Sequence, residues 1–263
     1  MSSNTSTGGS GGGGGYENPH VAPQITFYTF PDCPYCQRVH ILLTELALPF
    51  DEVLVDISKP REQWYLDINP RGLVPSLKFS NGAVTDEILT ESAIIAQFLA
   101  DSRPSHVLPA TLASPSAPLR RARVQLYADA FMSALGGHSR ALLFADAGAV
   151  DAMVDQLLDA VGTEVEPLLH GTRAAAPFLG GVEAVGLAEI LTAPFLLRLY
   201  ALSGRGVVPQ ALKQGLQALP LFGRWAEAVM RHPSVVKTWD EESFIGRAVA
   251  AVEKLKGEAA AKA

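Results

Sequence analysis

The feature that most limits how this chain can fold is an apolar segment that runs directly into a proline-marked helix. Residues 25–30 are rich in β-branched and aromatic side chains, which favours a strand. Pro31-Asp32 turns the chain, and Pro34 suits the first position of a helix. The apolar side chains of that helix recur on one face, and Pro49 ends it. A strand, a turn and a helix are therefore predicted in immediate succession.

Similar patterns continue to residue 100 and complete a small α/β unit. They predict a second strand over 50–55, a short helix over 61–68, two strands over 76–79 and 82–85, and a helix over 92–100. Ser80-Asn81-Gly82 separates the last two strands, and Asn-Gly favours tight hairpins. The predicted order is β-α-β-α-β-β-α.

The rest of the chain has only helical periodicity. A segment rich in proline, serine and alanine precedes it and is typical of a linker. The clearest helical segments are 119–145, 150–169, 187–202 and 222–231. We expect five parts: a Gly/Ser-rich disordered tail over 1–22, an α/β domain over 23–102, a linker over 103–118, an all-helical domain over 119–250, and a charged Ala/Lys/Glu tail over 251–263.

Both cysteines of the chain lie at the start of the first predicted helix, as Cys33-Pro34-Tyr35-Cys36. Cys33 falls at or near the N-cap, where free N–H groups and the helix dipole stabilise a thiolate and lower the pKa of the thiol. Cys36 lies one turn further in, within reach of Cys33. We predict that Cys33 is the nucleophile and that Cys36 resolves mixed disulfides.

Three other interpretations of the cysteine pair stay open. A zinc site could use Cys33, Cys36 and His40, but structural zinc normally takes four ligands and a second cysteine pair is missing. A structural disulfide would suit a secreted chain with more cysteines. Two ordinary buried cysteines remain possible. The strand, turn and proline-marked helix favour redox chemistry, and we predict no metal site.

Composition excludes several classes of function. The net charge is −6 and no basic cluster is present, which disfavours nucleic-acid binding. The first residues lack the apolar core of a secretory signal. The most apolar stretch, 187–202, is interrupted by Glu189 and Arg198, so no membrane span is expected. We expect a cytoplasmic protein.

Three local motifs resemble segments of known protein families. Cys33-Pro34-Tyr35-Cys36 after an apolar strand is similar to glutaredoxin. The segment from Asn69 to Pro75, Asn-Pro-Arg-Gly-Leu-Val-Pro, resembles the stretch that ends at the cis-proline of glutathione transferases, and Glu91-Ser92 resembles the acidic-Ser pair that opens their third helix. Residues 24–250 as a whole resemble a cysteine-type glutathione transferase of the omega class.

The resemblance implies a thioredoxin-like N-terminal domain, an all-α bundle and glutathione as co-substrate. It implies a glutathione site made by Cys33, the backbone of Val74 before Pro75, Glu91 with Ser92, and Lys59. A cis-proline turns the Val74 backbone outward, so that a peptide can pair with it. A carboxylate suits Ser92 at a helix N-terminus. Taken alone, Ser92 could be a plain N-cap and Lys59 a solvated lysine.

The expected activity is glutathione-dependent thiol transfer, including deglutathionylation and dehydroascorbate-type reduction. Many omega-like enzymes have a single cysteine in this motif, so Cys36 leaves the balance with conjugation open. The alternatives are a conjugating transferase acting on electrophiles and a non-enzymatic binding module. Tyr127 and Phe131 are candidates for an acceptor pocket, although aromatic residues at helical spacing are more often core. The resemblance also implies a homodimer.

Overall fold

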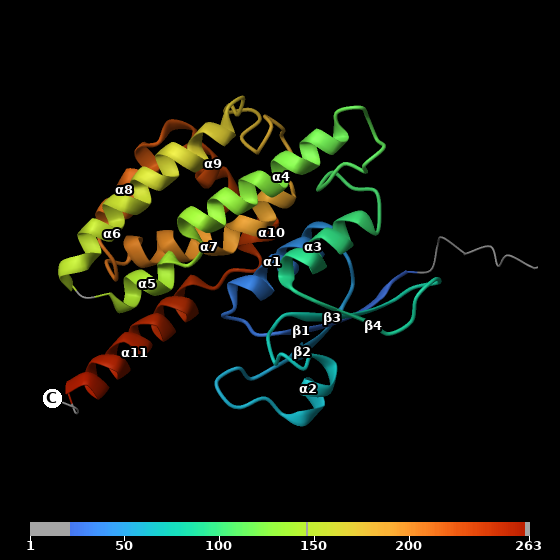
Figure 1. Ribbon diagram of the computed structural model, residues 1–263, viewed down its shortest axis with the longest axis horizontal. Coiled ribbons are helices and arrows are strands. Elements are labelled where there is room, and N and C mark those ends of the chain that lie inside the picture. The colour runs from blue at the N-terminus through green and yellow to red at the C-terminus, as the bar shows by residue number, and fades with distance from the viewer. Residues whose placement is uncertain (1–21, 146, 261–263) are drawn as a thin grey trace, which may run out of the picture.

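The structure is a computed structural model that describes residues 22–145 and 147–260. The tail expected over 1–22 lies outside these residues except for its last position. Two parts are distinct: a four-stranded sheet with three helices, and a bundle that contains the remaining helices (Figure 1). The α/β order predicted for the first part and the helical character of the second are confirmed.

The strands of the sheet lie in the order β2-β1-β3-β4. Strands β1 and β2 are parallel, with Thr26 opposite Asp51, and the other two pairs are antiparallel. Helix α1 makes the crossover between β1 and β2. The elements of this part are β1 (Gln24–Thr29), α1 (Pro34–Glu45), β2 (Asp51–Leu54), α2 (Gln63–Ile68), β3 (Ser76–Ser80), β4 (Glu87–Thr90) and α3 (Ser92–Asp101).

The alternation of side chains along β1 gives the sheet two different faces. Ile25 and Phe27 point into the main core beneath α1 and α3. Tyr28 points the other way and packs with Val55 and Tyr65 under α2. Helices α1 and α3 therefore lie between the sheet and the helical bundle, and α2 covers the outer face (Figure 1).

The predicted tight hairpin at Asn81-Gly82 is wrong. Strand β4 begins at Glu87, and the connection spans 81–86. The Asn81 side chain accepts hydrogen bonds from the N–H groups of Ala83 and Val84, which holds the chain in a local turn. Asp86, at φ 52°, then donates its N–H to the Ser80 hydroxyl and returns the chain to the sheet.

The helical part is more divided than its periodicity predicted. The expected helix over 119–145 is two helices joined by a π-helical segment, Met132–Gly136. This segment ends at Gly136 and is followed by Gly137, and glycine is a poor helix former. The end of the helical domain, which was expected at residue 250, lies inside the last helix. The helices are α4 (Ala117–Phe131), α5 (His138–Phe144), α6 (Ala147–Ala160), α7 (Leu187–Gly204), α8 (Gln210–Ala218), α9 (Pro220–Arg231), α10 (Pro233–Val236) and α11 (Glu241–Ala260).

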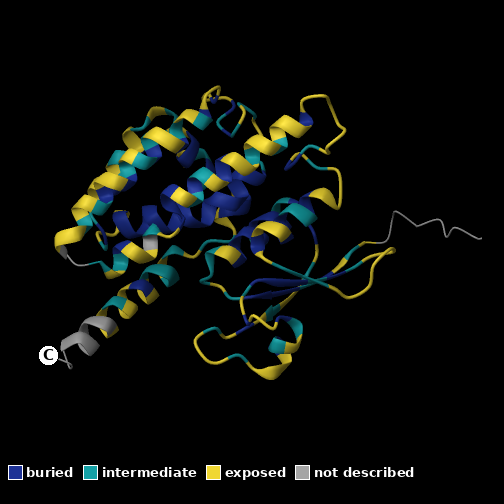
Figure 2. Ribbon diagram, in the orientation of Figure 1, coloured by how far each residue is buried: buried dark blue, intermediate teal, exposed yellow. Residues whose placement is uncertain are grey.

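Helix α7 is the centre of the bundle, and almost all of its residues are buried (Figure 2). It is the one described helix that is long and apolar enough to cross a membrane, but 94% of it is buried inside the protein, as in the core helix of a globular fold. Glu189 fixes its start by accepting the N–H groups of Gly186 and Leu179. Gly186 has no side chain to return the bond, so only half of a capping box is present.

Candidate active site

The loop after β1 places the Cys33 sulfur at the start of α1. The Cys33 N–H donates to the Phe30 carbonyl at 3.1 Å, and the Cys33 carbonyl accepts the N–H of Gln37 at 3.0 Å. Cys33 has extended backbone angles and is the N-cap, with Pro34 at the first helical position. Its side chain is partly exposed, whereas Cys36 is buried, and both are free thiols. An accessible sulfur therefore lies where unpaired helix N–H groups converge.

The surroundings of the two thiols shift their pKa values in opposite directions. The pKa of Cys33 falls from 9.0 to about 7, chiefly because the Cys36 thiol can donate a hydrogen bond to the thiolate. Backbone N–H groups of Cys36 and Tyr35 and the positive charge of Arg198 add to this effect, and burial opposes it. Burial raises the pKa of Cys36 well above its usual range. Cys33 is thus the nucleophile at neutral pH.

The backbone of Val74 lies beside this sulfur. Cys33 Sγ donates to the Val74 carbonyl at 3.8 Å, and the peptide bond between Val74 and Pro75 is cis. Buried polar groups hold the loop before it: the Asn69 amide and the Tyr65 hydroxyl both donate to the Leu73 carbonyl, at 2.8 and 2.6 Å. The segment that resembled the family motif therefore approaches the nucleophile.

Glu91 and Ser92 open α3, but both side chains already have partners. Glu91 is the N-cap, at φ 67°, and is ion-paired with Arg71 on the surface. Ser92 is buried, and its hydroxyl accepts a hydrogen bond from Arg38 Nη1 at 3.2 Å. The Ser92 hydroxyl keeps its own proton to donate.

Lys59 lies on the exposed loop after β2. Its ammonium is 2.9 Å from the Asp56 carboxylate, and that pairing raises the pKa of Lys59. Within the described part of the chain, no hydrogen bond or ion pair joins Lys59 to Cys33, Val74 or Ser92. The structure therefore brings Cys33 and Val74 together.

Tyr127 and Phe131, the candidates for an acceptor pocket, are core residues. Both side chains are completely buried, and their rings pack against Trp225 in the interior of the bundle. Positions 127 and 131 share the face of α4 that turns toward the centre of the bundle. Both side chains therefore pack in the core, which was the alternative interpretation of their spacing.

Sequence reasoning missed Arg198, which lies in the middle of α7. Its guanidinium donates to the Asp32 carbonyl at 3.0 Å, to the Gln37 side chain at 2.5 Å and to the Pro194 carbonyl at 2.8 Å. It also lies over the ring of Trp239, 5.1 Å from the centroid. Burial lowers the pKa of Arg198 to about 10, which leaves it cationic at neutral pH.

The signal for Arg198 was present in the sequence. A charged residue inside an otherwise apolar helix is destabilising when buried unless partners compensate it. Its interruption of the apolar stretch therefore indicated a position with hydrogen-bond partners, but not that those partners lie beside Cys33. In the part of the chain that the structure describes, no group of three or more His, Cys, Asp or Glu residues could hold a metal ion.

Comparison with known proteins places this geometry in a family. Residues 32–102 match the family described as glutathione S-transferase, N-terminal domain. Glutathione S-transferase omega-1 of Mus musculus is 26% identical over 213 residues, 80% of this chain and 78% of that protein. Residues 32–102 thus match the glutathione S-transferase N-terminal domain family, and the chain as a whole is similar to omega-class glutathione transferases.

Two further relatives extend along most of the chain. The pyrimidodiazepine synthase of Drosophila melanogaster is 26% identical over 218 residues, 82% of this chain and 81% of that protein. The crystal structure of glutathione transferase Omega 1C from Trametes versicolor superposes with a TM-score of 0.72 at 25% identity, over 88% of this chain and 98% of that one. The second, helical part of the glutathione transferase architecture is therefore present as well.

Proposed function

We propose that this glutathione transferase acts mainly as a glutathione-dependent thiol transferase, with the Cys33 thiolate as nucleophile. The observation that supports this most directly is the position of the Cys33 sulfur, which is partly exposed at a helix N-terminus and has a pKa lowered to about 7. Such a thiol is substantially ionised at neutral pH and remains a good nucleophile.

Glutathione is proposed to bind along the edge formed by Val74 and the start of α3. The outward backbone of Val74 would pair with the cysteine of the tripeptide, as in the addition of a short strand. The Ser92 hydroxyl and N–H would receive the γ-glutamyl carboxylate, and Glu91 would receive its ammonium. Arg71 neutralises part of the charge of Glu91 in the free protein, so it must share this carboxylate with the ligand. Lys59 is proposed to bind the other carboxylate of the tripeptide.

The proposed reaction has two exchange steps. The Cys33 thiolate attacks the glutathionyl sulfur of a mixed disulfide, a Cys33–glutathione disulfide forms, and the acceptor leaves as a thiolate. The thiolate of a second glutathione then attacks the glutathionyl sulfur, which gives oxidised glutathione and regenerates the Cys33 thiolate. With dehydroascorbate as acceptor, two glutathione molecules supply the two electrons.

Cys36 offers a second route, in which its thiolate attacks the Cys33 sulfur and releases glutathione. Burial raises the pKa of the Cys36 thiol and so disfavours formation of the attacking thiolate on this route. We therefore propose that Cys36 acts chiefly as the hydrogen-bond donor to the Cys33 thiolate and that free glutathione completes most turnovers.

Parallel assays on a glutathione mixed disulfide and on 1-chloro-2,4-dinitrobenzene test the proposal. Cys33→Ser should lower mixed-disulfide turnover at least about a hundredfold, because a hydroxyl is not ionised at neutral pH. Cys36→Ser should retain most of it. Full mixed-disulfide turnover in Cys33→Ser would refute the thiol-transfer mechanism, and strong aryl-halide turnover in the same variant would favour a conjugating enzyme.

A homodimer forms part of the proposal. Three large apolar side chains on the adjoining helices α3 and α4 are unusually exposed: Ile94 at 59%, Leu119 at 55% and Leu126 at 54%. Exposed apolar side chains on neighbouring helices suit a protein–protein contact. Sedimentation velocity of the wild type and of Leu126→Glu would test it, with dissociation expected for the variant. The cytoplasmic location stays a prediction.

A further inference from the structure

The side chain of Arg61 joins two loops of the first domain, the loop after β2 and the loop before β3. Its Nε donates to the Gly72 carbonyl at 2.9 Å. Its Nη1 donates to the carbonyls of Lys59 and Asp56, the latter at 3.1 Å. Its Nη2 donates to the Ile57 carbonyl at 3.3 Å. One guanidinium therefore collects four backbone carbonyl groups, three from the loop after β2 and one from the loop before β3.

The aliphatic part of Arg61 is fitted to the second loop as closely as its charged end. Gly72 has φ 63°, and a Cβ atom at this position would lie 2.9 Å from Arg61 Cγ. Glycine thus permits both the backbone conformation and the approach of the arginine. A guanidinium has five N–H donors in a fixed plane, whereas the ammonium of lysine is a compact point charge. Only arginine can therefore make all of these bonds at once.

Both loops carry residues of the proposed glutathione site. The loop after β2 carries Lys59, whose ammonium is held over this loop by the Asp56 carboxylate at 2.9 Å. The loop before β3 carries Val74, two residues after Gly72, and the Val74 carbonyl lies beside the Cys33 sulfur. Because Arg61 bonds to both loops, it fixes how far the first loop lies from Val74.

We propose that Arg61 is a positioning residue of the glutathione site, which holds the loop after β2 where Lys59 meets the glycine carboxylate while the cysteine of the tripeptide pairs with Val74. This role rests on the proposed binding of glutathione, but not on thiol transfer. A loop that is already ordered before the ligand arrives loses less conformational freedom on binding, which strengthens the affinity. Arg61 itself has its donors on the protein backbone and acts on the ligand through Lys59.

Titration calorimetry of the full-length protein with two ligands tests this role. The ligands are glutathione and its glycine carboxamide, which lacks only the negative charge proposed to meet Lys59. Arg61→Lys keeps the positive charge and loses the set of carbonyl bonds. It should weaken the binding of glutathione by about five- to tenfold. The carboxamide makes no ion pair with Lys59, so its affinity should change by less than about twofold.

A double variant separates positioning from a general effect on the fold. Lys59→Gln should weaken glutathione binding in the wild-type background, because it removes the partner of the glycine carboxylate. In the Arg61→Lys background the same substitution should add little, since Lys59 is no longer held in place. Such non-additivity is expected of residues that act through one another.

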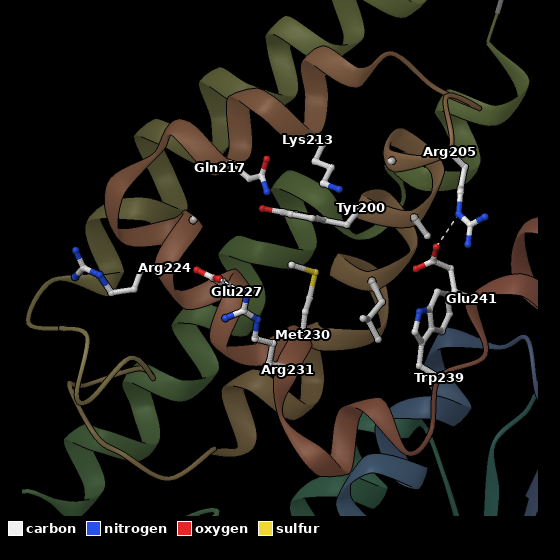
Figure 3. A pocket seen from close by; sticks show the side chains of 14 residues that line it. Tyr200, Arg205, Lys213, Gln217, Arg224, Glu227, Met230, Arg231, Trp239 and Glu241 are labelled. Atoms are coloured by element: carbon white, nitrogen blue, oxygen red, sulfur yellow. Dashed lines mark hydrogen bonds and ion pairs between the residues drawn. The ribbon is translucent and has the colours of Figure 1, made fainter.

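The chain offers a matched control in the helical part. Arg224 of α9 also donates to a backbone carbonyl, that of Thr172, at 3.2 Å. It lies at the edge of a cavity of about 810 Å³ in the bundle (Figure 3), which none of the described residues of the two loops lines. Arg224→Lys should therefore leave both affinities unchanged. Urea denaturation of all variants checks that the fold is retained.

Two results would overturn the positioning role while glutathione still binds the wild type. Unchanged affinity for glutathione in Arg61→Lys would mean that the carbonyl bonds are not needed. An equal loss for glutathione and the carboxamide would mean that Arg61 does not act through Lys59. Full mixed-disulfide turnover in Cys33→Ser would refute thiol transfer and leave these titrations unaffected, so the two proposals can fail separately.

Discussion

Cys33 and Cys36 carry the same thiol group, yet their surroundings give them different chemistry. The sulfur of Cys33 meets N–H groups, a neighbouring thiol and the charge of Arg198, whereas Cys36 lies under the sheet in an apolar interior. The sequence predicted this division from a proline and a spacing of three residues. It could not predict Arg198 as a contributor, because that residue comes from a helix 165 positions later in the chain, and only the packing of α7 against α1 brings the two together.

The first prediction concerns the pKa of Cys33 and its main cause. Since that pKa is lowered to about 7, the rate of alkylation by iodoacetamide should rise with pH and reach half of its maximum near pH 7. Cys36→Ala removes the donor that contributes most, so the midpoint should move up by about one unit, which corresponds to about 1.4 kcal/mol. Stopped alkylation followed by mass spectrometry gives the profile.

Cys36→Ser is the control for this experiment, because a hydroxyl keeps a donor at the same position. Its midpoint should stay closer to that of the wild type than the midpoint of Cys36→Ala. If both variants had the same alkylation profile as the wild type, the helix N-terminus, and not the second cysteine, would be what lowers the pKa of Cys33.

At the scale of elements, the strands and helices with strong local patterns were predicted, and the failures have specific causes. The sequence indicated a hairpin turn at Asn81-Gly82, but the Asn81 side chain accepts a hydrogen bond from the Val84 N–H and forms a longer local turn. Strand β4 therefore begins only at Glu87. The rings of Tyr127 and Phe131 have the same spacing whether they line a pocket or fill a core, and only the position of Trp225 decides between these. The second half of helix α11 was predicted to be a tail because its alanines and charges resembled those of one.

The contact between α7 and α1 provides the second prediction. Arg198→Met should destabilise the protein by on the order of 3 kcal/mol, since it leaves the Asp32 carbonyl and the Gln37 amide oxygen without their donor. The loss of positive charge should also shift the alkylation midpoint of Cys33 to higher pH. Urea denaturation and the alkylation profile measure the two effects independently.

Arg205→Met is the matched control at the C-cap of the same helix. Arg205 is exposed and pairs with Glu241 and Glu242 at the surface, where solvent screens ion pairs, so its removal should change the stability little. It should leave the midpoint of Cys33 unchanged. If Arg198→Met also left that midpoint in place, Arg198 would be a purely structural residue of the interface.

At the scale of the whole molecule, bonds between side chains and backbone connect the two parts of the fold. Arg38 Nε of α1 donates to the Leu191 carbonyl of α7 at 2.7 Å, and Gln37 donates to the Thr238 carbonyl at 3.1 Å. Arg247 of α11 is ion-paired with Asp32 beside the nucleophile. Helix α1 is therefore covered on one side by the sheet and on the other by the bundle, which sequence periodicity alone did not reveal.

This arrangement leads to the third prediction, that both parts unfold in a single transition. The variant Cys33→Ser has Cys36 as its only thiol, and Cys36 is buried in α1, so its reaction with a disulfide reagent reports the opening of the first domain. Circular dichroism at the helical band reports mainly the bundle. In increasing urea the two signals should have the same midpoint, because opening either domain breaks the hydrogen bonds that Arg38 and Arg198 make across the interface. Labelling of Cys36 at a clearly lower urea concentration than the loss of helix would show that the first domain opens by itself and that the interface contributes little to holding the nucleophile in place.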